Sequence, residues 1–318
     1  MDETKSLREK VLEEAYVNGI QNKTGLLHER LNLKKATVDY TLQKLLDENY
    51  FSRTKYEIDL NKLGIGNFAW VLVSVNWEKI AEEDLLKKLL SLTQVVTIAE
   101  ITGKSDLALK IFGSSITNIS AFILMVEKSF EGIITEVHVY FANAEYKRHY
   151  LPTPKKELYK INKVDCAIMH EKMANPKISL IEISQKHKFH RNTVSKRWDN
   201  LWKEGIVVKE LPDLTQKGYD ELKMGLKAFT VIKPVPGREE KIIKMLIKRK
   251  WIQDIFTTLS NEIVIIFRTE NSAALATEQR LIGKTDFSIK RTNTSIFLTK
   301  HNKNSLSLPE IKGLIKNC

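Results

Sequence analysis

The sequence predicts an α+β fold that is built twice, each copy a three-helix unit with a short β-ribbon followed by a βαββαβ unit. The first observation is internal repetition: Leu33–Leu46 reappears as Phe189–Trp202 at a constant offset (193 − 37 = 156). The second is that Asp59–Gly64 is echoed by Asp213–Gly218. An offset near half of the chain indicates one duplicated module, because solenoid repeats are only about 20–50 residues long.

Composition narrows the class of protein. A hydrophobic fraction of 42% allows a substantial core. The net charge of +12 favours a polyanionic partner, although a lysine-rich solvated surface gives the same sign. Two cysteines are too few for a disulfide framework or a zinc site. The chain starts without a signal peptide, and no apolar run is long enough to span a bilayer, so we expect a cytoplasmic protein without a membrane segment.

Residues 1–62 are expected to form a winged helix-turn-helix. Apolar residues at helical spacing predict helices over 7–18, 24–31 and 35–48. Asn49 suits the left-handed conformation that ends a helix. The segment 50–60 then has the pattern of a β-ribbon, the usual wing.

Residues 63–145 are expected to form a ferredoxin-like domain. Strands are predicted over 69–75, 95–101, 106–112 and 135–141, and helices over 82–90 and 115–129. Their order is βαββαβ. A basic linker with two prolines follows at 146–163, and solvation explains its charge as well as phosphate contact does.

The second copy follows the same plan. A second winged helix-turn-helix is expected over 164–218, with helices at 164–173, 179–187 and 190–204 and a wing from 206. A second ferredoxin-like domain is expected over 219–300, with strands at 228–232, 254–259, 262–268 and 287–297 and helices at 238–249 and 272–282. In the tail, 301–318, Ile311, Leu314 and Ile315 predict a short terminal helix.

Four local motifs stand in a characteristic order: Lys163–Met169, Ile181–Ser184, His190–Arg197 followed by Glu204–Val207, and the turn Ile101–Asp106. Together with the pairing of a winged helix-turn-helix and a βαββαβ domain, they resemble the Lrp/AsnC family of transcription regulators of bacteria and archaea. The resemblance covers nearly the whole chain, twice. It implies a DNA-binding regulator, and because the family normally pairs two single-unit chains, it implies an intrachain pseudo-dimer or a homo-oligomer here.

The sequence also departs from the family pattern. Asp39 and Tyr40 stand where the second copy has Ser195 and Lys196, and Asn49 stands where the family usually has glycine. The second-copy turn, Leu259–Glu262, lacks both the glycine and the aspartate at their expected places. The two copies are therefore expected to differ in what they bind.

The third helix of the second copy is the stronger candidate for reading DNA. Val194, Trp198 and Leu201 form its apolar stripe, and the polar residues lie largely off that stripe. Arginine and asparagine suit bidentate contacts to guanine and adenine, whereas lysine and serine suit phosphates. The candidates are His190, Arg191, Asn192, Thr193, Ser195, Lys196 and Arg197. The alternative is the solvated face of an ordinary amphipathic helix.

The third helix of the first copy is the weaker candidate. Its contact residues are Lys34, Lys35, Thr37, Tyr40, Thr41 and Lys44. Asp39 is repelled by phosphate but is able to accept a hydrogen bond from cytosine. A structural or protein-binding role for this unit remains the alternative. Two different reading surfaces in one chain predict an asymmetric DNA site, since identical helices read palindromes.

The turn Gly103, Lys104, Ser105 and Asp106 is the candidate effector site, because the resemblance implies that effectors, often amino acids, bind near it at an interface between such domains. Glycine lets the backbone approach a carboxylate closely, and Asp106 suits an ammonium. The alternative is a hairpin in which Asp106 merely caps the turn. The second copy is expected to have lost the pocket.

The chain lacks the common catalytic and metal motifs, so we expect neither an enzyme nor a cofactor or metal. Siroheme decarboxylases resemble the same pairing of domains, and His138, Arg148 and His149 are the residues that would hold carboxylates in that alternative. A further alternative is an assembly scaffold that does not bind DNA.

Overall fold

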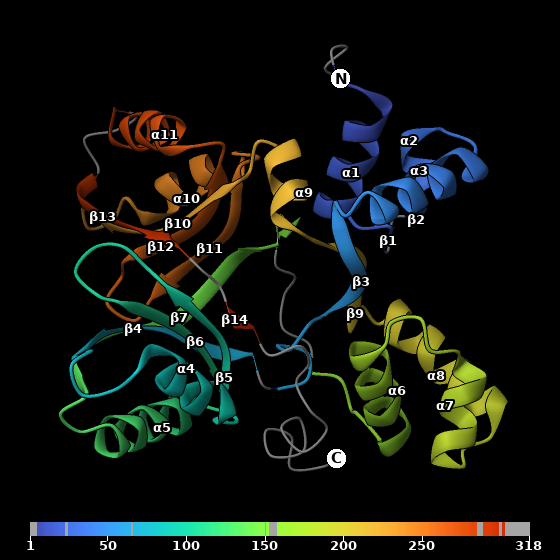
Figure 1. Ribbon diagram of the computed structural model, residues 1–318, viewed down its shortest axis with the longest axis horizontal. Coiled ribbons are helices and arrows are strands. Elements are labelled where there is room, and N and C mark those ends of the chain that lie inside the picture. The colour runs from blue at the N-terminus through green and yellow to red at the C-terminus, as the bar shows by residue number, and fades with distance from the viewer. Residues whose placement is uncertain are drawn as a thin grey trace.

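The computed structural model describes residues 5–22, 25–64, 66–149, 151–152, 158–284, 289–298 and 301–302. Figure 1 shows two three-helix units along one side of the molecule and two units of sheet and helices along the other. The predicted terminal helix of the tail lies outside the described residues, as do Lys155 and Lys156 of the predicted linker. In the described part of the chain, every helix is too short or too polar to cross a membrane.

The first three-helix unit consists of α1 (Leu7–Val17), α2 (Leu27–Leu31) and α3 (Lys35–Asp47). Ser6 and Glu9 form a capping box at the start of α1. The second helix is shorter than predicted, because Gly25–Leu26 is a short strand, β2, that pairs with β1 (Gln21–Asn22). Asn49 has φ 62°, the left-handed conformation that its position after the helix predicts.

The second three-helix unit consists of α6 (Lys163–Ala174), α7 (Leu180–His187) and α8 (Arg191–Lys203). Asn162 and Ser179 cap α6 and α7 with their side chains. Ile168, Ile183 and Leu201 are fully buried between the three helices. These helices lie within two residues of their predicted bounds.

The wings differ from the sequence expectation. Each copy contributes one strand, β3 (Phe51–Ile58) or β9 (Val207–Leu214), and the two strands pair antiparallel with each other. Leu211 and Leu214 of β9 pack into the core of the first three-helix unit, whereas Tyr56 and Ile58 of β3 pack against the second. Phe51 of β3 is also buried in the first core and Val207 of β9 in the second, so each helical unit packs against both strands of the ribbon.

The first βαββαβ unit contains β4 (Asn67–Val75), α4 (Glu82–Ser91), β5 (Val95–Glu100), β6 (Leu107–Gly113), α5 (Ile116–Ser129) and β7 (Ile134–Arg148). The second contains β10 (Leu226–Pro234), α10 (Glu239–Ile247), β11 (Ile252–Thr258), β12 (Ile263–Thr269), α11 (Ser272–Lys284) and β13 (Ile289–Phe297). Three further elements were not predicted: β8 (Leu151–Pro152), α9 (Gln216–Glu221) and β14 (His301–Asn302). Both units have the predicted order of strands and helices.

The two units share one antiparallel sheet of 10 strands, in the order β13-β10-β12-β11-β7-β4-β6-β5-β14 with β8 beside β7. The long strand β7 makes the connection, because its first part pairs with β4 and its last part with β11. The sequence predicted that this strand ends at 141 and that a linker begins at 146. The strand instead continues to Arg148.

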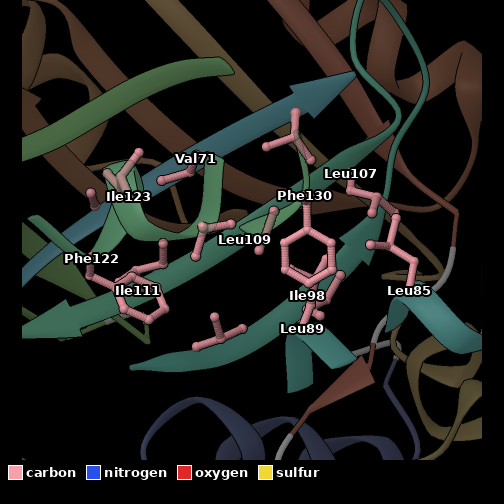
Figure 2. Close-up of a cluster of buried hydrophobic side chains, with 14 of the residues drawn as sticks. Val71, Leu85, Leu89, Ile98, Leu107, Leu109, Ile111, Phe122, Ile123 and Phe130 are labelled. Atoms are coloured by element: carbon pink, nitrogen blue, oxygen red, sulfur yellow. The ribbon is translucent and has the colours of Figure 1, made fainter. Parts of the chain in front are cut away.

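Both faces of the first sheet are covered. Val71 and its alternate neighbours pack against α4 and α5, in the cluster that Figure 2 shows. Phe68, Trp70 and Leu72 point the other way and pack against Phe229 of the second unit. Burial on both faces explains why Phe68–Val73 is an unbroken apolar run instead of an alternating one.

Candidate nucleic-acid interface

The outer face of α8 is open to solvent along its first turns. Arg191, Asn192, Thr193 and Lys196 are exposed, and Ser195 is half-buried. Behind them Val194 and Leu201 are fully buried, so the helix presents one apolar and one polar face. His190 is the N-cap, and its ring Nδ1 accepts a hydrogen bond from the amide of Asn192 at 3.3 Å.

Arg197, which the sequence predicts to contact DNA, forms an ion pair inside the second helical unit instead. Its Nε donates to Oδ1 of Asp165 at 2.7 Å, and its Nη2 donates to the other oxygen of that carboxylate and to the hydroxyl of Tyr159. Asp165 is fully buried in the first turn of α6. The hydrogen bonds that Arg197 donates to Asp165 raise the pKa of the guanidinium, because they favour its charged form. The guanidinium thus ties α8 to α6 and faces away from the exposed surface.

The face of α3 is also open, with a different set of side chains. Lys34, Lys35 and Lys44 are exposed, and Tyr40 is exposed to 71%. Asp39 is exposed beside them. Thr37 and Thr41 are half-buried, and the hydroxyl of Thr41 donates to the carbonyl of Thr37 at 2.7 Å. The exposed faces of α3 and α8 therefore carry different side chains.

One exposed cation near α8 was not among the predicted DNA contacts. Lys188 lies in the turn between α7 and α8 with φ 55°, directly before the helix that carries the polar face. Its position in the turn of a helix-turn-helix is the sequence signal that could have identified it as a DNA contact. The corresponding residue of the first copy is Asn32, also left-handed, with φ 52°.

The predicted linker supplies less open charge than its composition suggests. Lys147 is 5% exposed, and its Nζ donates to the carbonyls of Ile247 and Arg249 at 3.3 and 2.9 Å. Arg148 bonds the carboxylates of Glu145 and Asp59. These two basic residues stabilise the junction between units and are not free for phosphate. Lys160 and Lys163, in contrast, are exposed.

The turn Gly103–Asp106 lies where the two βαββαβ units meet. The amide of Thr102 donates to the carbonyl of Ile296 in β13 at 2.9 Å, and the hydroxyl of Thr102 accepts from the amide of Ile296 at 3.0 Å. Gly103 has φ 118°, and a Cβ there would lie 3.2 Å from the hydroxyl of Ser295.

Two polar groups of this turn form hydrogen bonds with β4. The Asp106 carboxylate accepts a hydrogen bond from the amide of Val75 at 2.8 Å, and the Lys104 carbonyl accepts one from the hydroxyl of Ser74 at 3.2 Å. Ser105 is buried, whereas the side chain of Lys104 is exposed. The geometry agrees with the capping role that the sequence left open for Asp106.

The three residues weighed for a decarboxylase do not converge on one open site. His138 lies on the exposed side of β7, with Nε2 3.0 Å from the carboxylate of Glu136. Arg148 is held by its two carboxylates, and the ring of His149 contacts the side-chain amide of Gln253 at 3.0 Å.

Comparisons with known proteins agree with the architecture. No family model matches the chain. An uncharacterized HTH-type transcriptional regulator of Pyrococcus abyssi is 22% identical over 125 residues, which cover 39% of this chain and 83% of the relative. A relative of the same description from Pyrococcus furiosus is 20% identical over 124 residues, which cover 39% of this chain and 82% of that protein.

Among solved structures, the siroheme decarboxylase NirDL superimposes with a TM-score of 0.61 at 11% identity, covering 97% of this chain and 98% of its own. The likeness over both halves shows that the duplicated arrangement is a known fold. At this identity it shows the fold and nothing about chemistry.

Proposed function

We propose that this chain, a regulator of the Lrp/AsnC kind that carries both units of a pair in one polypeptide, binds double-stranded DNA through α3 and α8. The observation that carries the proposal is the polar outer face of α8. Its first turns expose arginine, asparagine and lysine side chains, with Val194 and Leu201 fully buried behind them, after the short turn that contains Lys188. Such a helix fits the major groove.

The side chains divide into two tasks. Arg191 and Asn192, at the exposed N-terminal end of α8, suit base edges, because both side chains form bidentate contacts. Lys188 and Lys196 suit the flanking phosphates, which set the register of the helix on the duplex. In the first unit Lys34 and Lys35 take the phosphate role, and Tyr40 presents a large exposed ring to the groove wall.

One alternative is disfavoured by specific contacts. A decarboxylase that follows the chemistry of its fold neighbour needs free cations for carboxylates, but Arg148 is already paired with Glu145 and Asp59.

A single substitution tests the reading role of α8. Arg191→Ala should lower affinity for the cognate site by about 1–3 kcal/mol, the usual contribution of one good base contact. The measurement is a gel-shift titration on a site that genome-wide footprinting at two salt concentrations identifies. Arg238→Ala, an exposed arginine in the second βαββαβ unit, is the matched control.

Three outcomes oppose the proposal. Equal losses in Arg191→Ala and Arg238→Ala would reduce the effect to net charge. An equal loss on all sequences would reassign Arg191 to phosphate. A protein that binds no DNA but develops a Soret band with an iron tetrapyrrole would belong with the enzymes of this fold.

A further inference from the structure

A cavity of about 440 Å³ lies between the first three-helix unit and the second βαββαβ unit. One wall comes from α1 and α2, and the other from the segment directly after α10, which lies at the same end of the molecule (Figure 1). Its volume is within the range of small-molecule sites. Val17, Leu31, Met224 and Ile247 give it an apolar part.

The charges that line the cavity are unbalanced. Its carboxylates are already paired: Glu13 with Lys5 at 2.7 Å, and Glu14 with Arg30 at 2.8 Å. Lys10, Lys248 and Lys250 also line it, and their ammonium groups have no partner among the described residues. Cations from both walls therefore face a space that offers them no free carboxylate.

Two more cations lie at the same wall. Arg249 has Glu278 as a charged neighbour. Lys147 donates two of its three protons to the carbonyls of Ile247 and Arg249, and burial lowers its pKa to about 8. An anion in the cavity would favour the charged form of this ammonium.

The duplicated half of the molecule shows that this cationic wall is not a requirement of the fold. With β5 and β11 aligned (252 − 95 = 157), Lys248–Lys250 corresponds to Ser91–Thr93. With the helix caps aligned (162 − 6 = 156), Lys10 corresponds to Cys166, which is buried. At the equivalent junction Val96 packs directly against the core of the second helical unit. The junction at the second helical unit is thus an apolar contact, whereas the junction at the first holds a cationic cavity.

We propose that this cavity binds a small multiply phosphorylated molecule that bridges Lys10 on α1 and Lys248 and Lys250 after α10. Several phosphate oxygens match several ammonium groups, and the apolar part of the cavity accommodates an organic group such as a nucleoside. The volume excludes a duplex, which separates this site from the DNA surface.

A ligand in this position would connect the first reader to the second βαββαβ unit. It would fix the orientation of α3 relative to α8 and so change DNA affinity by linkage. This regulatory consequence depends on the proposed DNA binding, whereas ligand binding itself does not.

The test is isothermal titration of the full chain, without DNA, with ATP and with inorganic tripolyphosphate. The unmodified chain should bind at least one of them. Lys248→Ala/Lys250→Ala should weaken binding about tenfold or more, because two charged contacts are lost. Lys10→Ala should also weaken ligand binding, because Lys10 lies on the opposite wall of the cavity. Lys87→Ala/Lys88→Ala, which removes two exposed lysines from α4 of the other copy, is the matched control and should bind normally.

Hydrogen exchange supplies the second readout. Ligand should protect α1 and residues 247–252 together, because it contacts both walls. The proposal is wrong if neither probe binds, if the Lys248/Lys250 variant binds as tightly as the unmodified chain, or if the Lys87/Lys88 variant loses as much. None of these results bears on whether α8 reads DNA, because no DNA is present.

Discussion

At the residue scale, two arginines on α8 have different roles because their surroundings differ. Arg191 is exposed at the start of the helix, whereas Arg197 reaches back to a fully buried aspartate on α6. The sequence pattern makes both candidates for DNA contact and places Arg197 off the apolar stripe. Periodicity gives the angle of a residue around a helix, but it does not show that a long side chain has found a buried carboxylate.

This contrast makes a prediction about stability. Arg197→Ala should lower the free energy of unfolding by about 3–5 kcal/mol, because it leaves the Asp165 carboxylate buried and unpaired. Arg191→Ala should change that free energy by less than about 0.5 kcal/mol, as exposed substitutions usually do. Urea denaturation of both variants is the measurement. Similar stabilities would mean that the Asp165 pair does not hold the second helical unit together.

At the element scale, the shared ribbon of β3 and β9 is the main difference between expectation and structure. Most helices and strands could be predicted to within a few residues, because apolar spacing and capping residues are local signals. The partner of a strand is not local. Nothing in 50–60 or 206–211 says that each strand pairs with the other copy, nor that β7 extends to Arg148 and joins the two sheets.

Because each wing strand contributes side chains to both helical cores, some mutations in one strand should act on the other half of the chain. Leu211→Ala should destabilise the chain by about 2–5 kcal/mol, since it removes a buried side chain from β9. Hydrogen exchange should quicken first in α1 and α3, whose core it joins, although β9 follows the second helical unit in sequence. Ile58→Ala, the reciprocal control in β3, should loosen α6 and α8. Loosening of α6 and α8 by Leu211→Ala, with α1 and α3 unchanged, would contradict the placement of Leu211 in the first core.

At the scale of the whole molecule, duplication lets one polypeptide contain the contacts of a symmetric pair. The two halves of the shared sheet pack against each other around Trp70 and Phe229, and the paired wings join the two helical units. Symmetry in the scaffold coexists with asymmetry at its surfaces, because residues on exposed faces are free to diverge. The exposed faces of α3 and α8 differ, and the cationic cavity at the first helical unit corresponds to an apolar contact of Val96 at the second.

Hydroxyl-radical footprinting of the cognate site shows whether one chain carries two non-equivalent DNA-reading helices. The unmodified chain is compared with Lys35→Ala/Tyr40→Ala in α3 and with Arg191→Ala/Asn192→Ala in α8, at protein concentrations that saturate the site. Each variant should lose protection of the DNA over a different part of an asymmetric site and keep the protection of the rest. Loss of the same protection in both variants, or a palindromic footprint that neither variant alters, would contradict the presence of two non-equivalent readers.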